Sequence, residues 1–276
     1  MGCASVSPLP DVEVRPGSLP LIISAPHGGS LRPGEIPRRS WGSRHNDVHT
    51  VAVTEAVAAR LLDGTGESPT VIINHLARAK LDANRDITEA AQDDPRAEDA
   101  WHAYHQAIEG SLDEAVHAHG FALLVDLHGH RHVLQRVELG YRLQAADYSV
   151  PDARLDDDPT FLEASSISAL VRLTGLPLSS LLRGPDSLGA ALEQEGIPAV
   201  PGPADPDPGE TPYWNGGYTT ARYGVEWRDH VAAIQVECPR DAREERDHRR
   251  ALGESIGNAL VAHLDDIEAA RAAHLQ

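Results

Sequence analysis

Short apolar runs along the chain predict the strands of a buried sheet. Several runs lack polar alternation, which is typical of strands covered on both faces. The predicted strands span 21–24, 70–74, 121–126, 137–143, 197–200 and 232–237. Between them, helical patterns are predicted over 47–62, 95–118, 160–173, 187–195 and 243–272. Asp94 and Pro95 are suited to begin the second helix, and Gly120 to end it. This alternation predicts a three-layer α/β/α sandwich with a mixed, mostly parallel sheet.

Length and composition indicate one catalytic domain over residues 1–276, with residues 1–17 expected to be a mobile N-terminal segment. Hydrophobic residues make up 41% of the chain and aromatic residues only 4%, so an aliphatic core is expected. The two cysteines favour a reducing compartment. No apolar run resembles a signal peptide or could span a bilayer. We therefore expect a cytoplasmic protein without membrane contact, and the oligomeric state stays open.

The charge balance argues against a nucleic-acid partner. A formal net charge of -18, from 24 Lys+Arg against 42 Asp+Glu, leaves little for a basic face. Lys80 is the only lysine, so nearly every positive charge is an arginine. An anionic substrate would have to be held by local arginines, which bind carboxylates with two parallel hydrogen bonds.

The strongest candidate for chemistry follows the predicted strand 121–126. There the chain reads Asp126-Leu-His128-Gly-His130-Arg-His132. Side chains alternate along a strand, so Asp126, His128 and His130 are expected on one side. Imidazole beside carboxylate is a common zinc-binding combination, with the carboxylate either binding the metal or orienting the ring.

Two other segments offer ligands and anion donors. His27 directly follows the first strand, although a turn with an incidental histidine explains it equally well. Asp47 opens a helix, where it could equally be the N-cap. Asn84 and Arg85 have the character of a carboxylate clamp, and the alternative is a surface salt bridge between Asp82 and Arg85.

The last predicted strand brings a carboxylate to the same edge. Glu237 ends this strand and is expected to point toward the histidines, unless it only pairs with Arg240. A glutamate near a metal can take a proton from water and pass it to a leaving nitrogen. The Gly-Gly-Tyr218 loop precedes Arg222, a second candidate donor to a substrate carboxylate.

Taken in order, Ser-x-Pro-His, Asp-x-Asn-Arg, Asp-Leu-His, Gly-Gly-Tyr and Gln-x-Glu resemble the motifs of the N-formylglutamate amidohydrolase family, over about residues 19–240. The resemblance implies a fold like that of zinc carboxypeptidases (phosphorylase/hydrolase-like). It also implies one Zn²⁺ per chain on His27 and His128, with Asp47 preferred over Glu35 as the third ligand. Asn84 and Arg85 match the part of the family motif that holds the substrate carboxylate, and Glu237 matches the general base.

This chain departs from the family's simpler Asp-Leu-His-Ser form, because Gly129 and His130 follow His128. The departure indicates a divergent branch with an altered pocket beyond the metal, so His130 and Tyr218 join Arg222 as candidate substrate contacts. The expected activity is zinc-dependent cleavage of an amide in an N-acyl amino acid or small peptide with a free carboxylate. Alternatives are a non-catalytic metal- and carboxylate-binding protein and a metal-dependent phosphoesterase.

Overall fold

A computed structural model describes residues 10–226 and 229–276. In this part, seven strands form one sheet in the order β1-β3-β2-β4-β7-β5-β6. The strands are β1 (Val12–Arg15), β2 (Leu21–Ala25), β3 (Thr70–Asn74), β4 (Ala122–Gly129), β5 (Val137–Gly140), β6 (Ala199–Val200) and β7 (Val231–Cys238). Strands β3, β2, β4 and β7 are parallel, while β1 is antiparallel to β3 and β5 to β7. The predicted mixed, mostly parallel sheet is confirmed.

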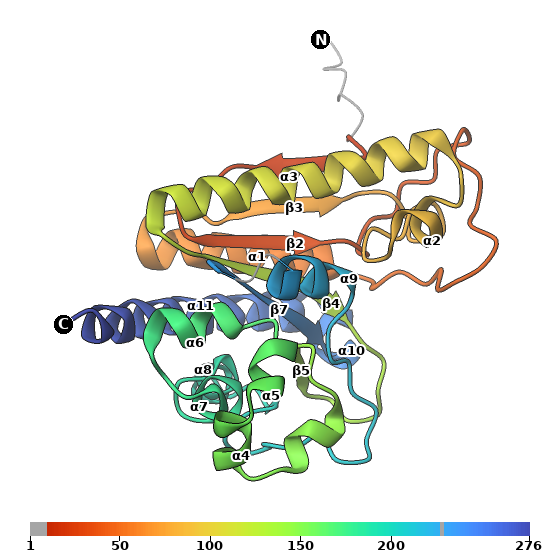
Figure 1. Cartoon of the computed structure of the whole chain (residues 1–276). Coiled ribbons are helices and arrows are strands. Elements are labelled where there is room, and N and C mark those ends of the chain that lie inside the picture. Colours follow the sequence, from red (N-terminus) through yellow and green to blue (C-terminus); the bar gives the residue numbers. More distant parts are fainter. Residues whose placement is uncertain (1–9, 227–228) are drawn as a thin grey trace.

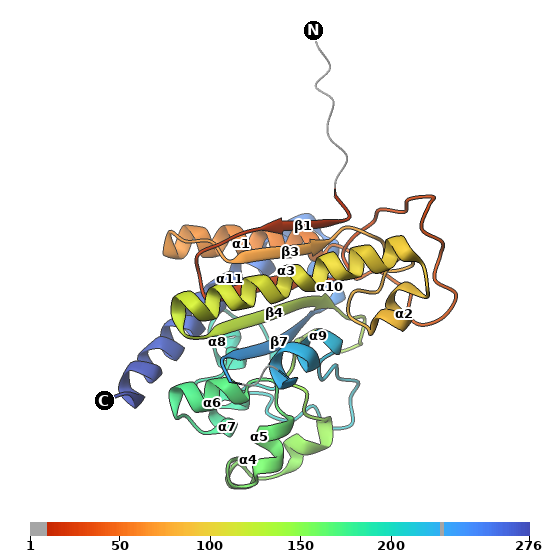
Figure 2. The ribbon, with the colours of Figure 1, turned by 45° about the horizontal axis from the view of Figure 1, so that its top comes forward.

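Helices cover both faces of this sheet (Figures 1 and 2). The long helix α3 (Pro95–His119) lies on one face, and α1 (Thr50–Thr65) packs beside α11 (Arg246–His274) on the other. The shorter helices are α2 (Ile87–Ala91), α4 (Asp152–Asp157), α5 (Pro159–Ala164), α6 (Ser168–Thr174), α7 (Leu178–Arg183), α8 (Leu188–Gln194), α9 (Tyr218–Thr220) and α10 (Arg240–Glu244), with η1 (Ala145–Ser149) and the π-helix η2 (Ala221–Glu226). The three-layer sandwich expected from the sequence is thereby confirmed.

The core lies in two layers, and the period of the strands decides which layer each side chain enters. Along β4, Leu123 and Val125 pack with α1 and α11, whereas Ala122 and Leu124 pack with α3. Strands β2 and β7 alternate in the same way. Every second side chain of these three parallel strands therefore faces α3.

The ends of α3 follow the sequence signals. The side chain of Asp94 accepts a hydrogen bond from the backbone N–H of Ala97, and Pro95 occupies the first turn. Gly120 ends the helix with φ of 82°, a left-handed conformation that favours glycine.

Two element predictions were wrong, and one alternative is excluded. Val12–Arg15 is an edge strand paired with β3, although residues 1–17 were expected to be mobile; residues 1–9 lie outside the described part. The helix predicted over 160–173 is divided into α5 and α6, and the side chain of Ser165 accepts a hydrogen bond from the backbone N–H of Ile167 between them. Asp47 is not the N-cap of α1, because His49 occupies that position.

Among the described residues, none of the helices has the length and apolar character needed to cross a bilayer.

The fold carries a built-in sensitivity to acid at His263 of α11. This side chain is 2% exposed, and its Nε2 has no hydrogen-bond partner within residues 10–226 and 229–276. Burial lowers the pKa of His263 from 6.5 to about 4. The unfolded chain therefore binds more protons below pH 6.5, and stability falls as the pH drops from about 6.5 to 4.

We expect His263 to account for a loss of roughly 3 kcal/mol in unfolding free energy across this window. Urea unfolding of wild type and His263→Leu, at about pH 7 and about pH 4.5, measures it. The variant should lose less stability on acidification than wild type. Equal losses in the two proteins would show that His263 does not contribute.

Candidate metal centre and active site

The site lies where three neighbouring strands change from apolar to polar on the face that carries α3. On this face β2 continues from Ile22 to Ser24. Strand β4 ends in Asp126 and His128. Strand β7 ends in Gln235 and Glu237, and Glu237 is in register with His128. In parallel α/β sheets, ligands bind at the carboxyl ends of strands near a switch in strand order, and β2 and β4 flank such a switch.

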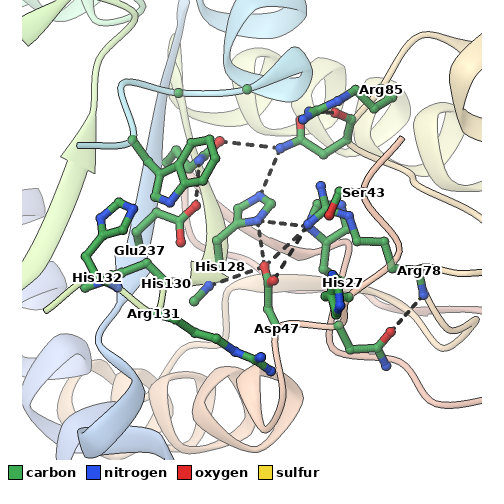
Figure 3. Close-up of a pocket in the computed structure, with 18 of the residues that line it drawn as sticks. His27, Ser43, Asp47, Arg78, Arg85, His128, His130, Arg131, His132 and Glu237 are labelled. Atoms are coloured by element: carbon green, nitrogen blue, oxygen red, sulfur yellow. Dashed lines mark hydrogen bonds and ion pairs between the residues drawn. The ribbon is translucent and has the colours of Figure 1, made fainter. Parts of the chain in front are cut away.

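Two imidazoles and one carboxylate converge in this region (Figure 3). His27 follows β2, Asp47 precedes α1, and all three side chains of the group His27, Asp47 and His128 are buried. The Nδ1 atoms of His27 and His128 lie 3.1 Å apart. Asp47 Oδ2 lies 3.3 Å from Nδ1 of His27 and 3.1 Å from Nδ1 of His128. Glu35, the alternative ligand, borders a different cavity.

Two further carboxylates fix the orientation of the two rings by binding their Nε2 atoms. Nε2 of His27 donates to Oδ1 of Asp82 at 2.6 Å, and Nε2 of His128 donates to Oδ2 of Asp126 at 2.8 Å. Asp82 also accepts a 2.8 Å bond from Arg78 Nε. Burial would raise the pKa of Asp82, but His27 and Arg78 outweigh it and hold the pKa well below its usual range. The alternative of an Asp82–Arg85 surface salt bridge is therefore excluded, because Asp82 belongs to a buried network.

The donor set fits a metal ion. With each Nε2 donating a proton to a carboxylate, a neutral ring presents an unprotonated Nδ1 toward the other ring. Tetrahedral ligands about 2.0–2.1 Å from zinc lie roughly 3.3–3.4 Å from one another, close to the distances observed here. Burial would lower the pKa of His128, but Asp126 and Asp47 raise it to about 10. These carboxylates thus favour a positive charge at the ring, which either a second proton on Nδ1 or a metal ion can supply.

Glu237 stands beside this group with one oxygen uncommitted. Its Oε1 accepts a 2.9 Å bond from Gln235, whereas the buried Oε2 has no hydrogen-bond partner among the described residues. Burial raises the pKa of Glu237 to about 8; His128 opposes this shift, and Asp47 and Glu138 add to it. A carboxylate with this pKa can accept and release a proton near neutral pH.

Asn84 and Arg85 both line the same cavity, whose volume is about 420 Å³. Asn84 is 2% exposed, accepts from the backbone N–H of Thr219 at 2.8 Å, and places its Nδ2 3.1 Å from Nε2 of His128. Gly217 passes so close that a Cβ there would lie 2.3 Å from Asn84 Nδ2. Asn84 therefore helps to hold the site. Arg85 is partly exposed and 3.5 Å from Glu89, so its guanidinium remains close to solvent.

Arg222 and Tyr218, predicted to bind substrate, lie outside the lining of this cavity. Arg222 forms a 2.7 Å ion pair with Glu109 of α3 and a 3.1 Å hydrogen bond to the hydroxyl of Tyr218. The turn from α9 into η2 directs both side chains toward α3, where the Arg222 guanidinium lies over Trp101. Their position corrects the prediction, because the pair with Glu109 occupies the guanidinium away from the cavity.

His130 lines the cavity as predicted, but both ring nitrogens are engaged within its own loop. Nε2 donates to the carbonyl of Arg136 at 2.8 Å, and Nδ1 accepts from the backbone N–H of His132 at 3.1 Å. His132 instead bonds Glu138 at 2.7 Å and stacks on Trp214, and both rings line the cavity. His132 is therefore better placed than His130 to meet a substrate, and the sequence interpretation did not select it.

Arg78 and Arg243 were also missed, because nothing in their local sequence marks them. The Arg243 guanidinium donates to the carbonyls of Cys238 and His130, each at 3.1 Å. A Cβ at Gly129 would lie 2.3 Å from this guanidinium, so the glycine after His128 makes room for Arg243. The departure from the simpler motif thus has a packing cause.

Comparisons with known proteins identify a family and similar folds. The sequence model of the N-formylglutamate amidohydrolase family matches residues 87–242. This range includes His128 and Glu237 but not His27 or Asp47. The structure resembles N-formylglutamate amidohydrolase from Ralstonia eutropha, with a TM-score of 0.57 and 15% identity over 96% of this chain and 100% of that one. A gene product of Agrobacterium tumefaciens gives a TM-score of 0.55 and 15% identity, over 94% and 96% of the two chains. No curated protein matches the sequence.

The family match defines a hydrolase that acts on C–N bonds. Because the family match spans more than half of the sequence, the chain belongs to the N-formylglutamate amidohydrolase family, and the resemblance read from its motifs is confirmed.

We expect purified protein to contain one divalent metal ion per chain, held by His27, Asp47 and His128. Elemental analysis of wild type and His128→Ala measures this, with circular dichroism to verify that the variant is folded. The variant should lose the metal because it lacks one of three ligands. A folded wild-type protein that contains no metal and takes none up on titration would contradict the assignment.

The carboxylates behind the rings should control metal affinity without touching the metal. Asp82→Asn removes the acceptor charge behind His27, so we expect metal affinity to fall by about 10–100-fold. Competition with a chelator of known affinity measures the change. Asp86→Asn, at the exposed N-cap of α2, serves as a control, and an equal loss in both variants would rule out a specific role for Asp82.

Proposed function

We propose that this protein is a zinc-dependent hydrolase that cleaves the amide bond of an N-acyl amino acid, or of a short peptide with a free carboxylate. One observation carries the proposal: the group His27, Asp47 and His128 shares a cavity with the uncommitted oxygen of Glu237. Membership of an amidohydrolase family supports the reaction class. The two imidazoles and single carboxylate favour Zn²⁺ over the oxygen-binding cations.

The residues of the chain divide the chemistry. When bound, the ion would supply Lewis-acid polarisation of the substrate carbonyl and of a water molecule. Glu237 then accepts the proton of the attacking water at Oε2 and delivers it to the amide nitrogen as the C–N bond breaks. Gln235 keeps Oε1 in place through its 2.9 Å bond, so Oε2 is the oxygen that exchanges the proton.

Substrate orientation falls to Arg85, at the mouth of the cavity. Its guanidinium is a rigid two-pronged donor that suits a carboxylate. Its Nη1 donates to the carbonyl of Asn84 at 2.7 Å, which holds the guanidinium close to the residue that lies against His128. We call His27, Asp47 and His128 the metal group. A carboxylate held by Arg85 would place the neighbouring amide toward the metal group and raise the rate through positioning.

The decisive variant is Glu237→Gln, which keeps the shape of the side chain and removes its basicity. We expect kcat for release of free amine to fall by about 100–10,000-fold, because proton transfer is lost while the metal ligands remain. Wild type and variant are screened against N-formyl and N-acetyl amino acids, and metal content is measured in the same samples.

Glu210→Gln, on an exposed segment outside the cavity, is the matched control and should retain wild-type turnover. An unchanged kcat in Glu237→Gln would exclude the proposed base. Tight substrate binding by wild type with no turnover of any amide would identify a non-catalytic binding protein.

A further inference from the structure

A second cavity, of about 530 Å³, adjoins the candidate active site and is strongly basic. Its charged lining consists of Arg32, Arg38, Arg44, Lys80 and Arg131, and no described aspartate or glutamate borders it. We call this cavity the arginine cleft. In a chain with a net charge of -18, a concave surface with cations alone is the reverse of the overall field.

The arginines of the cleft lack acidic partners. Elsewhere, arginines commonly pair with carboxylates, as Arg15 does with Glu55 at 2.7 Å and Arg136 with Asp205. By contrast, none of the four cleft arginines forms an ion pair with a carboxylate of residues 10–226 or 229–276. Arg44 and Lys80 donate to backbone carbonyls, at Arg39 and Ser40 for Arg44 and at Ile36 for Lys80. Neutral carbonyls fix these side chains without cancelling their charge.

The cleft is continuous with the active-site cavity. His45, Asn46 and Arg131 line both. Asn46 is held in place, because its amide donates to the carbonyl of Gly29 and accepts a 3.0 Å bond from the backbone N–H of Arg78. Arg131 follows the strand that carries His128, and its side chain is drawn beside the metal group in Figure 3. A ligand can therefore extend from the metal group into the cleft along this shared wall.

Resting on the function proposed above, we propose that the arginine cleft binds a second anionic group of the substrate, a carboxylate or a phosphate, beyond the carboxylate held by Arg85. The substrate is then an N-acylated acidic peptide or a comparable polyanionic amide. Guanidinium groups bind both oxyanions with paired hydrogen bonds, which explains why four arginines converge here. An N-acyl amino acid with only the one carboxylate that Arg85 holds would leave these charges unused.

The kinetic test compares two formyl peptides of equal size with amidated C-termini, N-formyl-Glu-Glu-Glu-NH2 and N-formyl-Glu-Gln-Gln-NH2. Wild type should show the lower KM for the acidic peptide, and this preference should weaken as salt screens the cleft. Arg32→Gln/Arg38→Gln should raise KM for the acidic peptide by about tenfold, the size expected for the loss of two exposed ion pairs, and leave kcat unchanged. KM for the neutral-tailed peptide should stay within about twofold.

The control variant Arg154→Gln/Arg250→Gln changes the net charge equally at exposed sites outside both cavities. An equal rise in KM in both double variants would reduce the effect to net charge and overturn the proposal. Equal KM values of wild type for the two peptides would also overturn the proposal, with one exception. The exception is that inorganic phosphate binds to wild type but not to Arg32→Gln/Arg38→Gln. That last result would identify the anionic group as a phosphate.

Binding is also measured without turnover, so that the two proposals can fail separately. Calorimetric titration of Glu237→Gln with the acidic peptide should give an affinity that falls about tenfold when the two cleft arginines are also replaced. Charge-dependent binding without hydrolysis by wild type would contradict only the proposed reaction. Hydrolysis without any preference for either anionic group would contradict only the role of the cleft.

Discussion

The two imidazole–carboxylate pairs behind the metal group are the interactions on which the site depends. A buried carboxylate is tolerated only where it is paired and hydrogen-bonded, and Asp82 and Asp126 meet this condition through His27 and His128. By using each Nε2, the two pairs turn each Nδ1 toward the same point. Asp47 adds a third acceptor there, so the arrangement is complete only with a positive charge between these atoms.

The site lies at three parallel strand ends because of the order of apolar and polar side chains along each strand. Each strand supplies apolar side chains under α3 and then polar ones beyond it, so the change from core to site needs no break in the sheet. The register between β4 and β7 sets His128 beside Glu237, and that between β5 and β7 sets Glu237 beside Glu138. Regular backbone hydrogen bonding therefore fixes the spacing between metal group and base.

The sequence predicted what depends on period and order, and failed where a role depends on distant partners. Alternation along β4 and β7 was enough to bring His128 and Glu237 to one edge. The family resemblance brought in His27, and it implied a third ligand for which Asp47 was preferred over Glu35. Asp82 was given no role in the site, because its partners Arg78 and His27 cannot be identified from its local sequence. The prediction for Arg222 was wrong for the converse reason. Its partner, Glu109, lies on a distant helix, and the motif around Arg222 does not reveal this pairing.

The residues proposed for catalysis and those proposed for substrate selection lie in different parts of the fold. The metal group and Glu237 are held by buried pairs that tolerate little change, whereas the walls around them come from loops after strands. Gly129 admits Arg243, whose bonds to backbone carbonyls secure the loop that carries His130 and His132. Arg131 leaves that same loop toward the arginine cleft. Under the proposed function, changes in this loop alter which anions reach the site without disturbing the ligands.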